Sequence, residues 1–460
     1  MRALRLPEAS RALMRDRPWL VDRALLRMSQ TEHNRIEGEV LAGTRQRSAD
    51  CRQTTLSLDS RAWLFAVLAA SLALRWSLFD FESGDYRAVL SRWYDFFVEE
   101  GAWQGLALKE PRATYPPFYL YLISLSTLLP LPKLYAIKVF SVAADYIAAW
   151  YIWRLARWRW MVAGQIPAVA RHDECSQAVA PMREGATHAA IAAIAIFLFL
   201  PTVVMNSAFW GQCDMMYTTG FVASLCYLVE ARPVPALVAF GFSCALKPQA
   251  IFWCPLLAGL FISRRLPWKW LWVPVAVYAA CGLPAIFAGK PVWHVLWPLG
   301  QVDITPGLNF NVANVYQWVG TRNSEVYWAM GVGLTLLATE LLMLQIVKGP
   351  ARGISGARWL VTLALMSVLF PPFLLPGMHD RYFFPADVLS LVYAFYVPRG
   401  WRVAVIVPLA SVLAYFPFLF GMEPAPLSVV AVALLGAIFL VAKELVWPAS
   451  SESRVEGATS

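Results

Sequence analysis

The chain has 460 residues, of which 58% are hydrophobic and only 15% are charged. A soluble protein of this length would carry about 25% charged residues, so the soluble, disordered and collagen-like classes are excluded. The net charge of +9 indicates basic cytoplasmic loops and contact with anionic membrane lipids rather than with a nucleic acid. The seven Cys and five His show no metal-binding spacing, so we expect no bound metal or other cofactor, although a divalent metal stays open.

The segment 1–60 contains eleven Arg, eight acidic residues and no Lys. It has no apolar run of signal-sequence length, and its acidic residues argue against a transit peptide. We therefore predict an Arg-rich cytoplasmic tail at 1–60, a transmembrane domain at 61–448 and a cytoplasmic C-terminal tail at 449–460.

The transmembrane domain is predicted to be all-α and polytopic, because only helices or closed barrels satisfy their backbone hydrogen bonds in lipid. The twelve expected spans are 61–79, 134–153, 188–205, 215–230, 233–247, 249–262, 270–288, 325–347, 358–376, 383–397, 402–420 and 426–446. Several are shorter than the usual 20 or so residues.

The basic residues between the spans predict the orientation. They cluster at Arg154–Arg183, Arg232, Arg264–Lys269, Lys348–Arg358 and Arg399–Arg402. With strict alternation all five clusters fall on the cytoplasmic side, as the positive-inside rule requires. Both termini are then cytoplasmic, and the remaining loops are extracytoplasmic.

Two extracytoplasmic loops are long, 80–115 and 289–325. In the first, the stripe Tyr86, Leu90, Trp93 and Phe97 has helical spacing and predicts an amphipathic helix lying flat on the membrane surface. The segment 116–130 is too short to span and contains Pro130, so we expect a re-entrant helix that dips into the outer side of the membrane. Within the spans, the intramembrane carboxylate Asp145 is expected to have a polar partner.

Asp85 follows Ser83-Gly84 directly after the first span, at membrane-surface height. A carboxylate there could act as a general base towards a hydroxyl nucleophile. The competing interpretation is a helix N-cap, since Asp is a preferred N-cap residue. Glu82 and Asp95 are rival bases in the same acidic loop.

Other unusual polar residues fall on the same predicted face. The segment 206–214 carries amide, indole and carboxylate groups suited to sugar hydroxyls, although a plain polar loop would look similar. Lys247 is costly near the membrane unless it meets an anion, and His379 and Arg381 with it could hold a phosphate. The Tyr115-Pro116-Pro117 sequence predicts a helix start.

These motifs together resemble the GT-C superfamily of polytopic glycosyltransferases that use polyprenyl-phosphate sugars. The similarity is greatest to bacterial relatives of the mannosyltransferase that adds the second mannose of the GPI anchor. It covers roughly 80–400. It rests on Gly84-Asp85-Tyr86, Tyr115-Pro116-Pro117, Asn206 to Asp214 with its Trp-Gly-Gln-x-Asp core, Lys247-Pro248-Gln249 and His379-Asp380-Arg381-Tyr382.

The resemblance implies inverting transfer of a hexose, mannose above all, at the extracytoplasmic face of the inner membrane. The donor would be a polyprenyl-phosphate sugar, and the acceptor a glycolipid, a glycan or a protein. Asp85 would be the catalytic base, and Arg381, His379 and Lys247 would bind the donor phosphate. The residues expected to bind sugar or acceptor are Asn206, Trp210, Gln212, Asp214, Gln249 and Tyr115.

Three alternatives stay open from the sequence. A transporter or flippase of a lipid-linked sugar would show inverted repeats and polar residues at mid-membrane, whereas here the polar residues gather at one face. An O-antigen ligase or polymerase would transfer from a diphosphate, for which more outer-face Arg is expected. A structural scaffold is the third.

Overall fold

A computed structural model describes residues 57–108, 115–163, 175–296, 307–319, 324–349 and 353–447. The chain divides into two units, residues 1–61 and 62–460, and the second unit holds the helical bundle. The predicted tail 449–460 and nearly all of the predicted tail 1–60 lie outside the described residues.

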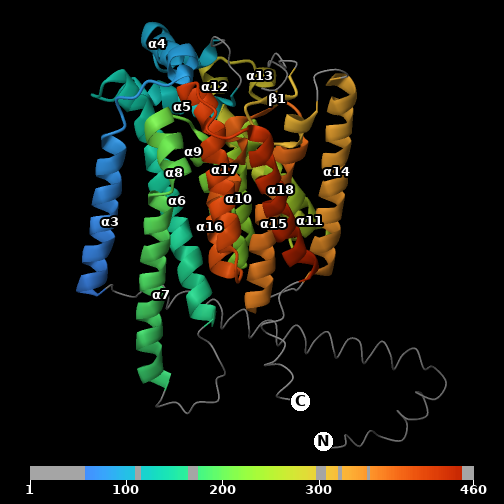
Figure 1. Ribbon diagram of the computed structural model, residues 1–460. Coiled ribbons are helices and arrows are strands. Elements are labelled where there is room, and N and C mark those ends of the chain that lie inside the picture. Colours follow the sequence, from blue (N-terminus) through green and yellow to red (C-terminus); the bar gives the residue numbers. More distant parts are fainter. Residues whose placement is uncertain are drawn as a thin grey trace, which may run out of the picture. The chain divides into compact units, whose positions relative to one another are not determined.

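Helices dominate the described part of the second unit, as predicted (Figure 1). The longer ones are α3 (Leu58–Trp76), α4 (Ser91–Glu100), α5 (Pro117–Ser126), α6 (Lys133–Ala163), α7 (Cys175–Leu198), α9 (Asp214–Val229), α10 (Pro233–Leu246), α11 (Cys254–Ile262), α12 (Trp272–Ala288), α14 (Ser324–Lys348), α15 (Gly353–Leu374), α16 (Phe384–Tyr396), α17 (Trp401–Phe420) and α18 (Leu427–Val446).

Short elements connect the long helices. They are η2 (Tyr86–Leu90), η3 (Gln104–Ala107), α8 (Pro201–Val204), η4 (Met205–Trp210), η5 (Pro248–Trp253), η6 (Trp268–Trp270), α13 (Val292–Leu296), β1 (Asn309–Phe310), η8 (Val315–Trp318), β2 (Met378–His379) and η9 (Asp380–Phe383). The strands β1 and β2 form one parallel pair, with Phe310 opposite His379.

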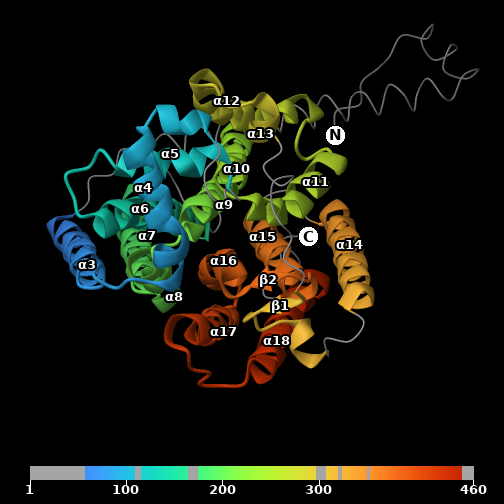
Figure 2. The same ribbon diagram turned by 90° about the horizontal axis from the view of Figure 1, so that it is seen from above.

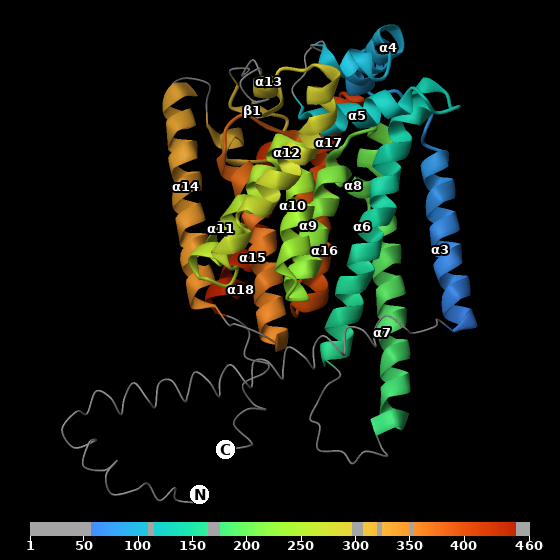
Figure 3. The same cartoon turned by 180° about the vertical axis from the view of Figure 1, so that it is seen from behind.

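Helix α16 occupies the centre of the bundle, where it packs against α6, α9, α15 and α17. Seen from above, α3 and α14 lie at opposite margins of the bundle (Figure 2). Helices α4, α5 and α13 gather at one end, as the view from behind also shows (Figure 3). This end carries the site described below.

Five helices among the described residues are long and apolar enough to cross a membrane, and a sixth is added if one bent pair counts as one span. They are Trp268–Ala288, Ser324–Lys348, Gly356–Leu374, Trp401–Phe420 and Leu427–Val446. Each of the twelve expected segments does contain a helix. Membrane crossing by the shorter or more polar helices stays a prediction.

The basic loop expected after the second span is largely helical. Helix α6 continues to Ala163, and α7 already begins at Cys175. The expected loop 154–188 was therefore too long. Arg154 is well accommodated in the helix because its Nη2 donates to both carboxylate oxygens of Glu230 at 2.6 Å.

The segment expected as a polar loop after the third span is helical too. Helix α7 ends at Leu198, and the chain restarts as α8 and η4 at an angle of 53°. Pro201 can begin a helix but cannot continue one, since it lacks an N–H. The Leu198 carbonyl accepts a hydrogen bond from Arg75 Nη1 at 3.0 Å.

A buried ion pair holds this break against the neighbouring helices. Arg75 of α3 donates its Nε to Asp145 Oδ2 of α6 at 2.8 Å, and Ser207 Oγ of η4 donates to the same oxygen at 2.6 Å. The Arg75 and Asp145 side chains are both inaccessible to solvent. The polar partner expected for Asp145 is thus confirmed, and it fixes the segment that carries Asn206 and Trp210.

We expect Asp145→Asn to lower the free energy of unfolding by about 3 kcal/mol, because it leaves a buried guanidinium without its counter-charge. Asp95→Asn is the matched control, since Asp95 pairs with Lys133 at an exposed position and should contribute less than about 1 kcal/mol. Chemical unfolding in one lipid nanodisc preparation measures both. Equal losses of unfolding free energy would mean that the buried ion pair contributes no more to stability than the exposed one.

The predicted amphipathic helix is present as η2 and α4, and its stripe Tyr86, Leu90, Trp93 and Phe97 is buried. The covering partner is protein and not lipid, because the Trp93 ring lies 6.2 Å from the ring of Tyr119 on α5. The stripe thus joins the main hydrophobic core, and the expected position of the helix flat on the membrane surface stays a prediction.

Helix α5 begins at Pro117 with Pro116 at its N-cap, as the Pro-Pro sequence predicted. With ten residues it is too short to span a bilayer. It packs between α4, α10 and α12. Whether it dips into the membrane stays a prediction.

Candidate functional site

Asp85 lies in the first turn of the helix that leads into η2, and its carboxylate faces the segment 210–212. Trp210 Nε1 donates to Asp85 Oδ2 at 2.9 Å, and Gln212 Nε2 donates to the same oxygen at 2.5 Å. The side chain of Asp85 is 24% exposed. The carboxylate is thus held from one side and reachable from the other.

The N-cap interpretation of Asp85 is wrong. Ser83 is the capping residue, because its Oγ accepts the Tyr86 N–H at 3.1 Å. The same hydroxyl donates to the Trp210 carbonyl at 2.9 Å. Asp85 already has helical backbone angles and makes no capping hydrogen bond, which leaves its carboxylate for other contacts.

Gly211 turns the chain so that both Trp210 and Gln212 reach Asp85. Its φ of +81° is a left-handed conformation that favours glycine. The turn closes with the Gln212 N–H donating to the Asn206 carbonyl at 2.8 Å. The left-handed turn at Gly211 therefore explains why a glycine separates Trp210 from Gln212.

Arg381 lies among three carboxylates. Its Nη1 is 3.6 Å from Asp85 Oδ2 and 3.7 Å from Asp380 Oδ1, and its Nε is 3.8 Å from Asp214 Oδ2. Its guanidinium carbon also lies 5.5 Å from the centre of the Trp210 ring. Nε is buried and has no hydrogen-bond partner among the described residues. The three carboxylates therefore balance the charge of the Arg381 guanidinium, while its buried Nε–H group makes no hydrogen bond to the described residues.

Beneath Arg381, Asp214 and Lys247 form a buried ion pair, with side-chain exposures of 0% and 2%. Asn206 Nδ2 donates to Asp214 Oδ2 at 3.0 Å. The rings of Tyr115, Tyr217 and Tyr382 surround the Lys247 ammonium at 5.5 to 5.7 Å. A buried ammonium of this kind needs its carboxylate partner.

These contacts concern four residues whose expected binding roles stay predictions. Asn206, Trp210 and Asp214 are fully buried and Lys247 is nearly so. In this conformation they cannot line a sugar site or meet a phosphate directly. The polar groups that were expected to bind a ligand bind one another instead. Through these contacts they position Asp85 and Arg381.

His379 is expected to bind the donor phosphate, and its surroundings favour the uncharged imidazole for that role. Burial, with the nearby charges of Arg381 and Lys247, lowers the pKa of His379 to about 4, so it is neutral at pH 7. Its ring stacks on Phe310 at 4.7 Å with an interplanar angle of 13°. Phe310 comes from the loop 289–325 through the β1–β2 pair, a long-range contact that no sequence pattern revealed.

Asp380 was part of the matched motif but received no role from the sequence. It is 3% exposed and its Oδ1 accepts the Arg381 backbone N–H at 2.9 Å. Burial raises the pKa of Asp380 to about 7 despite the neighbouring guanidinium of Arg381, and Asp85 and Asp214 add to the increase. A carboxyl group beside the site can therefore change its charge near neutral pH.

Some expected residues lie apart from this cluster. Glu82 pairs with Arg87 at 3.1 Å and Asp95 with Lys133 at 2.6 Å, both at exposed positions, so neither rival base shares the surroundings of Asp85. Gln249 leaves a buried side-chain oxygen without a partner among the described residues. Within the described ranges, no three His, Cys, Asp or Glu side chains are placed to hold a metal ion.

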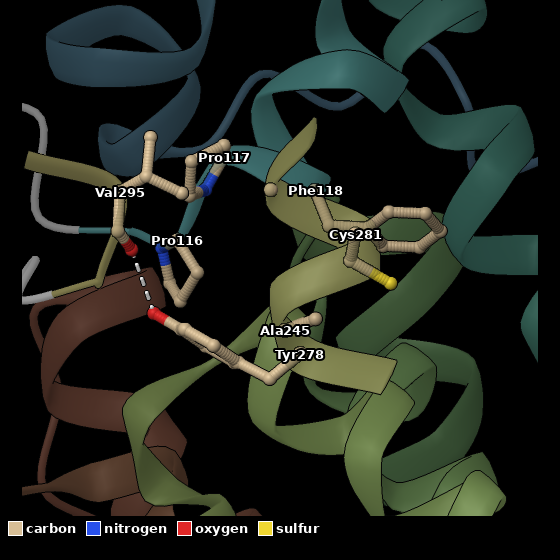
Figure 4. A pocket seen from close by; sticks show the side chains of 8 residues that line it. Pro116, Pro117, Phe118, Ala245, Tyr278, Cys281 and Val295 are labelled. Atoms are coloured by element: carbon tan, nitrogen blue, oxygen red, sulfur yellow. Dashed lines mark hydrogen bonds between the residues drawn. The ribbon is translucent and has the colours of Figure 1, made fainter. Parts of the chain in front are cut away.

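A shallow apolar depression, too narrow to hold a ligand, lies between α5, α10, α12 and α13 (Figure 4). The Tyr278 hydroxyl closes one side by donating to the Val295 carbonyl at 3.0 Å. The lining residues are Pro116, Pro117, Phe118, Ala245, Tyr278, Cys281, Gly282 and Val295. Tyr115 and Lys247 are close to this lining in sequence, but the depression contains none of the charged site residues.

Residues 112–303 match the family PIG-U, described as GPI transamidase subunit PIG-U. The matched segment contains Asn206 to Asp214 and Lys247, but it contains neither Asp85 nor Arg381. The match covers 192 of the 460 residues, which is less than half of the chain. No curated protein matches the chain.

Proposed function

We propose that this protein is a membrane-embedded glycosyltransferase that moves a hexose, which we take to be mannose, from a polyprenyl-phosphate donor to a hydroxyl acceptor. The observation that carries the proposal is the proximity of a partly exposed carboxylate, Asp85, to the guanidinium of Arg381, whose Nη1 lies 3.6 Å from Asp85 Oδ2 and whose side chain is 13% exposed. One group can accept a proton and the other can bind a phosphate oxygen, which are the two needs of this reaction.

The three donors near Asp85, from Trp210, Gln212 and Arg381, all approach Oδ2. We assign Oδ1 as the oxygen that takes the acceptor proton. The acceptor oxygen then bonds to the anomeric carbon with inversion, and the bond from that carbon to the phosphate oxygen breaks. The lipid phosphate leaves with the electron pair, and Arg381 stabilises the charge that grows on it.

The proposal includes the orientation implied by the loop charges. The site would face the extracytoplasmic side of the inner membrane, where lipid-borne donors are available. The helices expected to bind membrane lipids expose many large apolar side chains. Buried residues Asp214 and Lys247 would keep Arg381 positioned rather than contact the sugar.

The direct test is sugar transfer by the purified full-length protein. It is incubated in nanodiscs with radiolabelled polyprenyl-phosphate mannose and membrane lipids of the host, with the Asp85→Asn variant as control. We expect label in a new glycolipid with the wild type and almost none with the variant. Intact donor with every sugar tested would refute the proposal and favour a transporter, flippase or ligase.

The PIG-U similarity supports a second candidate, a non-catalytic subunit of a membrane complex that handles a glycolipid. The matched segment excludes both Asp85 and Arg381, so the matched part by itself does not contain the proposed chemistry. A protein that binds glycolipid, shows no transfer and co-purifies with a second membrane protein would favour this candidate.

Asp380 makes donor binding pH-dependent under the proposal. A bound phosphodiester adds a negative charge beside Arg381 and raises the pKa of Asp380 above its value of about 7 in the free protein. Binding therefore takes up a proton, and affinity should be constant below pH 7 and fall by about tenfold between pH 7 and 8.5. Asp380→Asn should bind with the same affinity throughout pH 6 to 9.

The measurement is the dissociation constant of a short-chain polyprenyl phosphomannose, whose single charge does not titrate in this range. His379→Gln is the control, because His379, with a pKa of about 4, is already neutral above pH 6. An Asp380→Asn variant with the wild-type pH profile would remove Asp380 from this role.

A further inference from the structure

The last turn of α17 lies against the candidate site. The Phe418 ring stacks on Trp210, with ring centres 5.2 Å apart and an interplanar angle of 23°. A Cβ atom at Gly84 would lie 3.4 Å from the edge of the same ring. Phe418 thus contacts the residue before Asp85 and the indole that donates to the Asp85 carboxylate.

The two stacked rings differ in exposure. Trp210 is completely buried, whereas Phe418 is 39% exposed. Trp210 therefore supports one side of the Phe418 ring, and part of that ring remains exposed. An aromatic ring held in this way offers a fixed apolar contact at low cost in side-chain entropy.

The hydrogen bonds of Asp85 restrict how an acceptor can approach. Trp210 and Gln212 both donate to Oδ2, and Arg381 lies nearest to Oδ2 as well. A hydroxyl group must then come to Oδ1, with the rest of its molecule kept clear of Arg381 and the donor phosphate. The Phe418 ring contacts Gly84, the residue before Asp85, and Trp210, which donates to the same carboxylate.

We infer that Phe418 is the stacking platform for a pyranose ring of the acceptor, whose hydroxyl meets Asp85. The acceptor would then be a glycolipid or glycan rather than a protein side chain. This inference rests on the proposed transferase function and specifies its acceptor. A pyranose has an apolar face of C–H groups that fits an aromatic ring, and its edge hydroxyls remain available to a carboxylate.

Phe420 provides a matched control two residues further along α17. It is also 39% exposed. It packs near Phe81 and Phe209, with ring centres 6.5 and 5.8 Å away. If both rings only anchored the helix at the membrane interface, their removal would have equal effects.

The first experiment compares steady-state transfer by full-length variants in nanodiscs. We expect Phe418→Ala and Phe418→Leu to raise the acceptor KM by about tenfold with an unchanged donor KM. Phe418→Tyr should stay within about twofold of the wild type, and Phe420→Ala should behave as the wild type. Equal increases for Phe418→Ala and Phe420→Ala would overturn the inference.

A binding measurement separates this inference from the proposed function. The probe is octyl α-mannopyranoside, observed by saturation-transfer NMR in nanodiscs free of glycoside detergents, with octyl glycerol ether as the probe without a pyranose. Saturation should reach the pyranose C–H protons with the wild type and Phe420→Ala, and be lost with Phe418→Ala. Sugar saturation that persists in Phe418→Ala, at an unchanged melting temperature, would refute the platform.

The two failures have different signatures. A wild type that saturates the pyranose protons but transfers no sugar would refute the transferase and retain a carbohydrate subsite at Phe418. A wild type that transfers sugar with the same acceptor KM in Phe418→Ala would retain the transferase and refute the subsite.

Discussion

Asp85→Asn should reduce turnover by at least about a hundredfold and leave the protein folded. A general base contributes about 10²–10⁴-fold to the rate, and an amide cannot replace it. Asn can still accept the hydrogen bonds of Trp210 and Gln212 through its oxygen. Donor binding should therefore survive, because Arg381 is unchanged.

Two further substitutions complete this test. Asp85→Ala leaves the donors of Trp210 and Gln212 without their acceptor, so it should be less stable than Asp85→Asn by about 1–3 kcal/mol. Asp95→Asn removes an exposed acid of the same loop and should retain full turnover. An Asp85→Asn enzyme within threefold of the wild type would exclude Asp85 as the base.

Arg381→Ala should lower kcat/KM for the donor by about a thousandfold. The guanidinium would bind the phosphate in the ground state and more strongly in the transition state, where charge on the leaving oxygen grows. Both the donor KM and kcat should therefore change. Arg381→Lys should recover only part of the loss, since the fork of the guanidinium is absent.

Folding has to be separated from catalysis in this variant, because Arg381→Ala leaves three carboxylates without their shared cation. The double variant Arg381→Ala/Asp380→Asn removes one of these charges and should recover stability but not activity. Arg87→Ala is the matched control, since the Arg87 side chain is 71% exposed and pairs with Glu82. Normal donor kinetics in Arg381→Ala would exclude Arg381 from the site.

Local patterns predicted the helices well because their causes are local. Apolar composition, the Pro-Pro start of α5 and the helical stripe from Tyr86 to Phe97 each depend on residues a few positions apart. Predictions from the sequence were wrong where a residue far away in the chain supplied a hydrogen bond that a segment lacked. Arg75 binds the carbonyl left free before Pro201, which makes the expected polar loop at 206–210 a continuation of a bent helix.

For the site, the sequence by itself determined which polar residues are unusual in so apolar a chain, and Asp85, Asp214, Lys247 and Arg381 were among them. Only the tertiary structure decided their pairing, since contacts between residues 85, 214 and 381 depend on how three segments of the chain meet. Burial then divided their roles: Asp214 and Lys247 neutralise each other in the interior, while Asp85 and Arg381 remain partly accessible. A charged side chain in an apolar interior needs an opposite charge beside it, and the sequence could name both charges but not which of them would stay free for a ligand.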